Sequence, residues 1–163
     1  MLTLLYIRIV MTIFQRILVY TIVLLLFAQM IRIDKTNPTV NPADDFIFNQ
    51  QVPAEVAQTL KIACYDCHSH ESTYPWYTSY APVSWWIKHH INEGREHLNF
   101  SVWATYSPKK ANHKLEECVE MLEEGEMPMS SYTLIHKEAV LTPQQKADLI
   151  AFFNLKRSAV ARK

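Results

Sequence analysis

The chain has 163 residues, with 16 Lys plus Arg against 16 Asp plus Glu, and it contains only two glycines. This length favours one domain with a short extra segment, and the absence of net charge gives no electrostatic reason to expect nucleic acid as a partner. Because so few glycines disfavour a turn-rich β architecture, we expect an all-α fold.

The first element in chain order is an apolar segment at residues 1–33, which we interpret as an N-terminal transmembrane helix that acts as a signal anchor. Its most hydrophobic part covers residues 17–31, between Arg16 and Arg32. This part is shorter than the roughly 20 residues of a typical span, but flanking arginines can reach the interface and extend it. Because no small-x-small cleavage site follows, an uncleaved anchor is favoured over a signal peptide or a buried helix of a soluble domain.

Residues 34–51 are predicted to be a linker, because they contain Asn-Pro and Asp-Asp pairs that are typical of turns. The globular domain is expected at residues 52–158, and residues 159–163 form a tail. Apolar residues at helical spacing, together with helix start and stop signals, predict four helices in this domain. They run from Pro53 into residues 64–68, from about Pro82 to Leu98, from the N-cap Ser107 to Gly125, and onward from a capping box at residues 142–145.

Residues 64–68 form a Cys-x-x-Cys-His motif, which is typical of covalent c-type haem attachment. Two thiols at this spacing can reach the two vinyl groups of one porphyrin, and the histidine can then bind the iron on the proximal side. We therefore predict one haem c, held by Cys64 and Cys67 as thioethers and by His68 as an axial iron ligand. A zinc or thiol–disulfide role is the alternative, but the chain has no second ligand pair at zinc spacing and no βαβ pattern.

The best candidate for the second axial ligand is Met127, which Pro128 keeps away from helical backbone angles. Met129 is the rival, and a histidine or an open site are further alternatives. A Met–His pair would suit electron transfer, because a thioether stabilises ferrous iron. An open distal site would instead indicate a haem-based sensor or a peroxidase-like enzyme, with His90 or His136 as the distal acid or base.

Tyr74, Trp76 and Trp86 are predicted to pack against the haem, where large aromatic side chains limit the access of water. Cys118 lies on the apolar side of the third predicted helix, and we expect it to be a small buried hydrophobe. Six acidic residues between positions 116 and 126 are interpreted as a solvated face of that helix, with a docking surface for a basic redox partner as the alternative.

Together, these segments resemble the bacterial haem-binding domain family, which has c-type cytochrome character. The resemblance covers roughly residues 52–153. It depends on the motif at 64–68 and on the segments Tyr74–Tyr77, Ala81–Trp85, His89–Arg95, Gly125–Pro128 and Ser131–His136. It implies one covalent haem in a mainly helical fold similar to small cytochromes c. Many small cytochromes have a shorter route between the attachment site and the methionine loop, and here residues 99–107 add an aromatic connection to that route.

We therefore expect a membrane-tethered monohaem c-type cytochrome that is an electron carrier rather than an enzyme. Because covalent haem attachment in bacterial cytochromes takes place outside the cytoplasmic membrane, the resemblance implies the inner membrane, with the haem domain facing the periplasm. The charges that flank the anchor are nearly balanced and do not set this orientation. The sequence indicates the membrane as a partner, but it does not identify the redox proteins on either side.

Overall fold

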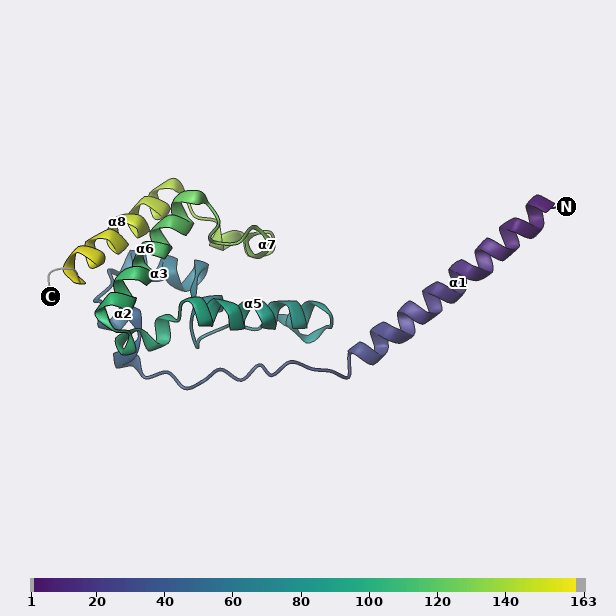
Figure 1. The fold of residues 1–163 in the computed structure, drawn as a ribbon, viewed down its shortest axis with the longest axis horizontal. Helices are drawn as coiled ribbons and strands as arrows, with labels where there is room; N and C mark the ends of the chain where they lie inside the picture. The colour runs from purple at the N-terminus through teal and green to yellow at the C-terminus, as the bar shows by residue number, and fades with distance from the viewer. Residues whose placement is uncertain (1, 161–163) are drawn as a thin grey trace. The chain divides into compact units, whose positions relative to one another are not determined.

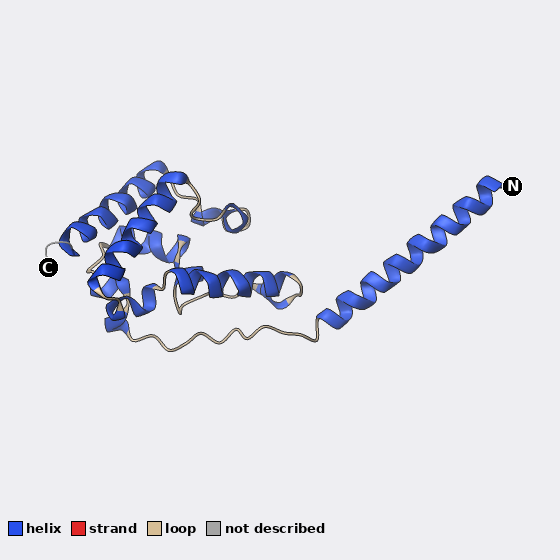
Figure 2. Ribbon diagram, in the orientation of Figure 1, coloured by secondary structure: helices blue, strands red, loops and turns tan. Residues whose placement is uncertain are grey.

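The computed structural model describes the backbone of residues 2–160 and the side chains of residues 12–159. Within these residues all regular secondary structure is helical, and no strand occurs (Figures 1 and 2). The prediction of an all-α fold is therefore confirmed. The chain forms two compact units, of which the first contains residues 1–35 and 74–89 and the second contains residues 36–73 and 90–163.

The first unit contains α1 (Leu2–Ala28), the 3₁₀ helix η2 (Trp76–Ser79) and the N-terminal half of α5 (Val83–His97). The side-chain amide of Gln29 binds both backbone groups of Ala81, donating to its oxygen and accepting from its nitrogen at 3.0 Å each. Among the described residues, no helix combines the length and the apolarity needed to cross a membrane. The predicted anchor includes residues 1–11, which lie outside the residues with described side chains.

The second unit contains the remaining helices, and α5 ends in it at His97. Apart from α5 they are, in chain order, η1 (Pro42–Asp44), α2 (Phe46–Asn49), α3 (Ala54–Ala63), α4 (Tyr65–His68), η3 (Phe100–Thr105), α6 (Pro108–Glu124), α7 (Ser130–Thr133), η4 (Lys137–Ala139) and α8 (Pro143–Val160).

The helix starts and stops follow the local sequence signals closely. Ser107 caps α6 by accepting a hydrogen bond from the backbone N–H of Lys110 at 3.3 Å, and Gly125 ends the helix with a φ of 77°. At the start of α8, Thr142 and Gln145 each accept from the other's backbone N–H, as a capping box requires. One difference is that the first predicted helix is divided, because Cys64 leaves helical geometry between α3 and α4.

The core of the second unit is built around Phe46, whose side chain is fully buried. Its ring centroid lies 4.7 Å from that of Trp103 and 5.1 Å from that of Phe100. The rings of Phe152 and Phe153, both on α8, lie within 6.2 Å of it. Helix α2 is therefore held between η3 and α8, and it brings the segment before α3 into the core.

Residues 42–49 of the segment predicted as a linker are therefore helical and packed, whereas the domain boundaries stay a prediction. The Asp-Asp pair that suggested a loop supplies a helix cap, because an oxygen of Asp45 accepts from the backbone N–H of Ile47 at 2.9 Å. The same carboxylate accepts a hydrogen bond from the hydroxyl of Tyr65. Burial raises the pKa of Asp45, and these hydrogen bonds oppose that effect. The turn-like composition concealed a short helix because its tertiary partners are distant in sequence.

Replacing Phe46 by Ala in the full-length chain should lower the free energy of unfolding by about 3–5 kcal/mol, because it leaves a cavity in the aromatic core. Phe48 on the same helix is 68% exposed, so Phe48→Ala should change this energy by less than about 0.5 kcal/mol. Guanidinium denaturation followed by circular dichroism measures both variants. Equal effects would show that residues 46–49 are a linker after all.

Candidate functional site

The two cysteines of the motif belong to a single helical turn. In α4 the backbone N–H groups of Cys67 and His68 both donate to the carbonyl oxygen of Cys64, at 3.2 and 2.9 Å. Cys64 caps this turn and Cys67 lies within it, and the two thiols interact, because Cys67 is the second cause, after burial, of the raised pKa of Cys64. Neither forms a disulfide, and burial raises the pKa of Cys64 to about 12 and that of Cys67 to about 11. In redox-active Cys-x-x-Cys pairs, by contrast, the pKa of the reactive cysteine is lowered.

The ring of His68 is held by the C-terminal end of α5. Its Nδ1 lies 2.9 Å from the carbonyl oxygen of Gly94 and 3.2 Å from that of Leu98. A carbonyl oxygen only accepts, so the proton must be on Nδ1, and the lone pair of Nε2 remains for another partner. Burial lowers the pKa of His68, which favours the neutral ring. Iron-binding histidines have this tautomer and this kind of hydrogen bond.

Gly94 allows α5 to approach the motif very closely. A Cβ atom at this position would lie 2.7 Å from the carbonyl oxygen of Cys67, which is closer than real side chains come to backbone. The next residue, Arg95, donates from Nε to the carbonyl oxygen of Ser69 at 2.7 Å and from Nη2 to the hydroxyl of Ser72 at 2.9 Å. The last turns of α5 therefore hold the motif and the residues that follow it.

A second set of contacts joins the motif to α7. The hydroxyl of Tyr132 donates to Asp66 at 2.8 Å, and the other oxygen of this carboxylate accepts from the backbone N–H of Thr73 at 2.8 Å. The Tyr132 ring stacks on His136, with centroids 4.2 Å apart and planes 15° apart. Because α7 directly follows the segment with both candidate methionines, these contacts tie that segment to the Cys-x-x-Cys-His motif.

The predicted ligands Met127 and Met129 are both half-buried, between α6 and α7. The backbone N–H of Met127 donates to the carbonyl oxygen of Met121 at 3.2 Å, which fixes how the chain leaves α6. They lie in the same unit as Cys64, Cys67 and His68. Which methionine binds iron stays a prediction.

The aromatic residues predicted to pack on the haem belong to the first unit. Trp76 is 77% exposed and Trp86 is 48% exposed, whereas Tyr74 is half-buried. Their contact with haem therefore stays a prediction.

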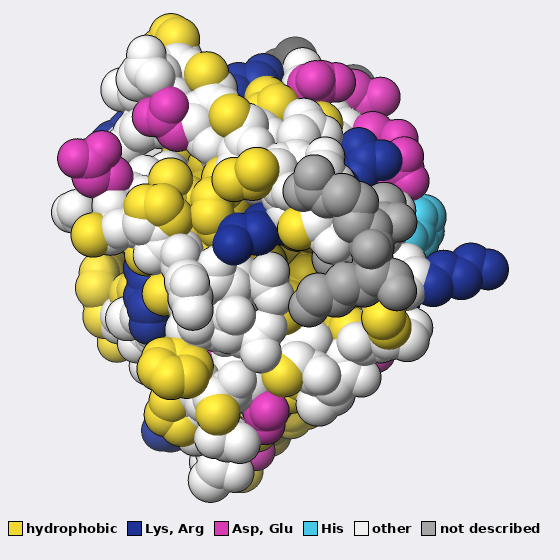
Figure 3. Space-filling model, turned by 90° about the vertical axis from the view of Figure 1, so that its left-hand side faces the viewer, with side chains coloured by type: hydrophobic (Ala, Val, Ile, Leu, Met, Phe, Trp, Pro, Cys, Tyr) yellow, Lys and Arg dark blue, Asp and Glu magenta, His cyan; other side chains and the backbone are white. Residues whose placement is uncertain are grey.

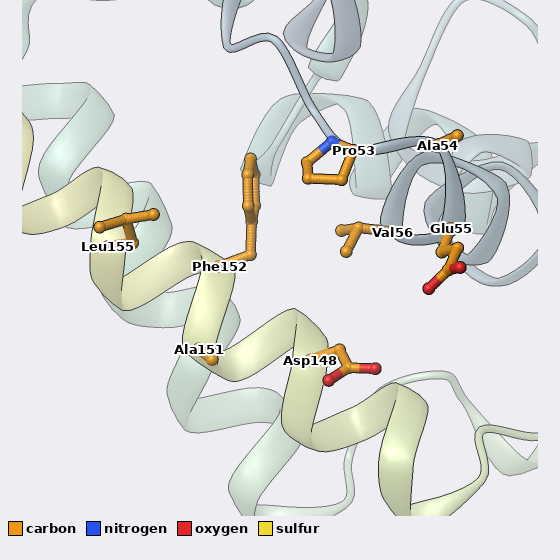
Figure 4. A pocket seen from close by; sticks show the side chains of 8 residues that line it. All are labelled: Pro53, Ala54, Glu55, Val56, Asp148, Ala151, Phe152 and Leu155. Atoms are coloured by element: carbon orange, nitrogen blue, oxygen red, sulfur yellow. The ribbon is translucent and has the colours of Figure 1, made fainter.

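A separate cavity of about 550 Å³ lies between the start of α3 and α8 (Figure 4). It is lined by Pro53, Ala54, Glu55, Val56, Asp148, Ala151, Phe152 and Leu155. None of the predicted haem ligands lines it.

Among the described residues, no group of three or more His, Cys, Asp or Glu side chains is arranged to hold a metal ion, so the zinc alternative has no ligand set there. The face shown in Figure 3 intersperses acidic, basic and hydrophobic side chains and has no extended basic area.

An all-α fold with two free thiols next to a histidine whose Nδ1–H is held by backbone fits the class of haem-binding proteins. Residues 23–155 match the family described as haem-binding domain. Since the match covers most of the chain, this protein belongs to that family, and the resemblance noted in the sequence is confirmed. Neither a curated protein nor a solved structure matches the chain significantly.

Sequence reasoning missed the roles of Asp66, Gly94, Arg95 and Tyr132. One signal was present for Gly94, which is one of only two glycines and lies inside a predicted helix. An isolated glycine there destabilises a helix by about 1 kcal/mol relative to alanine, so its presence indicates a packing reason. The other three gave no local signal, because their side chains bind residues of other segments that the local sequence pattern does not identify.

Gly94→Ala should destabilise the full-length protein by about 1–3 kcal/mol, because the clash with the Cys67 carbonyl outweighs the helix propensity that alanine adds. It should also change the visible spectrum of the haem-loaded protein, because His68 moves with α5. Thermal unfolding and absorption spectra measure the two effects.

Gly125→Ala is the matched control, because a Cβ atom at Gly125 meets nothing within 4 Å. Its left-handed backbone angle predicts a loss of about 1–2 kcal/mol with an unchanged haem spectrum. An unchanged spectrum for both variants would contradict the role of Gly94 in holding His68.

Proposed function

We propose that this protein is a membrane-tethered monohaem c-type cytochrome that transfers electrons on the periplasmic side of the bacterial inner membrane. The observation that carries the proposal is the orientation of His68, whose Nδ1–H donates to Gly94 and Leu98. This arrangement leaves the Nε2 lone pair available to bind iron, and the thiols of Cys64 and Cys67 precede His68 in sequence. Haem is expected as the ligand because the chain belongs to the haem-binding domain family.

Covalent attachment fits the thiols of Cys64, the N-cap of α4, and of Cys67 within α4. Each S–H bond would add across one vinyl double bond, so that sulfur bonds to one carbon and hydrogen to the other, and the step is redox-neutral. The raised pKa values of both cysteines indicate that the free protein keeps them as thiols. Once bound, the haem supplies an iron that cycles between the ferric and ferrous states.

We assign the second axial position to Met127, with Met129 as the rival. A thioether ligand opposite histidine raises the reduction potential and closes the iron to external ligands, as an electron carrier requires. His136 is a weaker candidate because its ring already stacks on Tyr132 and its Nδ1 lies 3.1 Å from Glu138. A sensor or peroxidase-like enzyme with an open site is the alternative.

The membrane tether is supported by the outer surface of α1. Its described part exposes large apolar side chains on all sides, among them Phe14 (65%), Leu24 (69%) and Leu26 (65%). A helix that is hydrophobic all round belongs in a protein core or in a membrane. Together with residues 1–11, this helix would give the anchor at residues 1–33. The periplasmic orientation follows from the covalent haem, which bacteria attach outside the cytoplasmic membrane.

Met127→Ala in the membrane-extracted holoprotein should abolish the weak red-end band of methionine-ligated ferric haem. It should also lower the reduction potential by on the order of 0.1–0.3 V, a part of the roughly 0.8 V range that axial ligands set. Absorption spectroscopy with a redox titration measures both. Met129→Ala is the matched control and should leave the band in place.

The opposite pattern for the two variants would assign the iron to Met129. An unchanged band and potential in both variants would exclude a methionine ligand. Carbon monoxide binding to the ferrous wild-type protein without loss of a protein ligand would instead establish the open-site alternative.

A further inference from the structure

We propose that Trp76, Tyr80 and Trp85 form an aromatic patch that inserts into the headgroup region of a phospholipid bilayer. This inference rests on the proposed function, because it requires α1 to be the membrane anchor. It adds a second membrane contact, made by a segment that follows the haem motif in sequence. It also gives Trp76 a role other than the haem packing predicted from the sequence.

The aromatic patch exposes large rings that a water-facing surface rarely carries together. Trp76 is 77% exposed, Tyr80 is 58% exposed and Trp85 is 37% exposed. The rings of Trp76 and Tyr80 pack edge to face with centroids 6.1 Å apart, so the two form a continuous surface. A contiguous exposed apolar patch indicates an interaction site. Tryptophan and tyrosine are the residues enriched where proteins cross the membrane–water interface.

Hydrogen bonds attach this patch to the residues that directly follow α1. The indole Nε1 of Trp85 donates to the carbonyl oxygen of Ile31 at 2.9 Å. Gln29 binds both backbone groups of Ala81, and Lys35 donates to the hydroxyl of Ser79 at 2.7 Å. Because α1 ends at Ala28, these contacts put the patch at the level where an anchoring helix leaves the hydrocarbon. The patch is thus continuous with the proposed anchor.

The charge of the first unit also suits a phospholipid surface. Its single acidic residue is Asp34, whereas its basic residues are Arg8, Arg16, Arg32, Lys35 and Lys88. Three of the five follow α1 in sequence, on the same side of the anchor as the patch. Basic residues near a membrane surface are attracted to anionic headgroups. Aromatic rings together with basic side chains favour lipid over a protein partner here.

The test uses the full-length holoprotein in liposomes of phosphatidylethanolamine and phosphatidylglycerol. A phospholipid with a diazirine close to its headgroup is photoactivated, and cross-linked peptides are mapped by mass spectrometry. We expect cross-links in α1 and also in the peptide that contains residues 74–88. The buried Trp103, which is 3% exposed, provides an internal reference that should remain unlabelled.

A double variant, Trp76→Ser with Tyr80→Ser, should lower cross-linking of residues 74–88 by about threefold or more, since the interfacial anchors are lost. It should leave the labelling of α1 unchanged. The matched control is Leu134→Ser, which removes a 70% exposed apolar side chain from the second unit and should alter neither signal.

Cross-links in α1 without any in residues 74–88 would overturn this inference and leave the anchor intact. Absence of cross-links in α1 as well would contradict the proposed anchor, and the inference with it. If the double variant changes the haem spectrum while residues 74–88 stay unlabelled, these aromatic rings pack on the haem and not on lipid.

Discussion

The contact between the last turns of α5 and the Cys-x-x-Cys-His motif is the constraint on which the rest of the site depends. Gly94 has no Cβ, so its backbone comes close enough for its carbonyl oxygen to accept from Nδ1 of His68 at 2.9 Å. The same carbonyl oxygen also accepts from the backbone N–H of Leu98 at 2.9 Å, and a carbonyl oxygen has two lone pairs, so it can hold both donors. One close approach thereby fixes the tautomer of His68 and the direction in which Nε2 points.

The other contacts extend this constraint through the second unit. Arg95 holds the residues after the motif, and Asp66 receives the hydroxyl of Tyr132 from α7. The segment with the candidate methionine ligands is therefore fixed at both ends, by the end of α6 and by α7. In the same unit, Phe46 packs against Phe152 and Phe153 of α8 in an aromatic core. In the proposed function, a ligand segment held in this way would reorganise little when the charge on iron changes, as an electron carrier requires.

Features encoded locally could be predicted from the sequence, whereas features that depend on distant partners could not. The boundaries of α5 and α6 and the start of α8 followed from apolar spacing, Ser107, Gly125 and the capping box, because each signal acts within one turn. Phe46 is buried against rings such as that of Phe100, and Arg95 donates a hydrogen bond to Ser69. In both cases the partner lies 26 or more positions away in sequence. The motif at 64–68 predicted haem binding from the sequence. The structure adds that the carbonyl groups of Gly94 and Leu98 orient its histidine.

The most direct test of the central claim is the mass of the denatured full-length chain expressed with haem maturation. We predict an increase of one haem that survives denaturation and maps to the peptide with Cys64 and Cys67. Replacing both cysteines by alanine should abolish it, whereas Cys118→Ala should leave it unchanged because Cys118 lies on α6, outside the motif. A chain that releases all its haem on denaturation, or gains the haem mass without these cysteines, would contradict covalent attachment at this site.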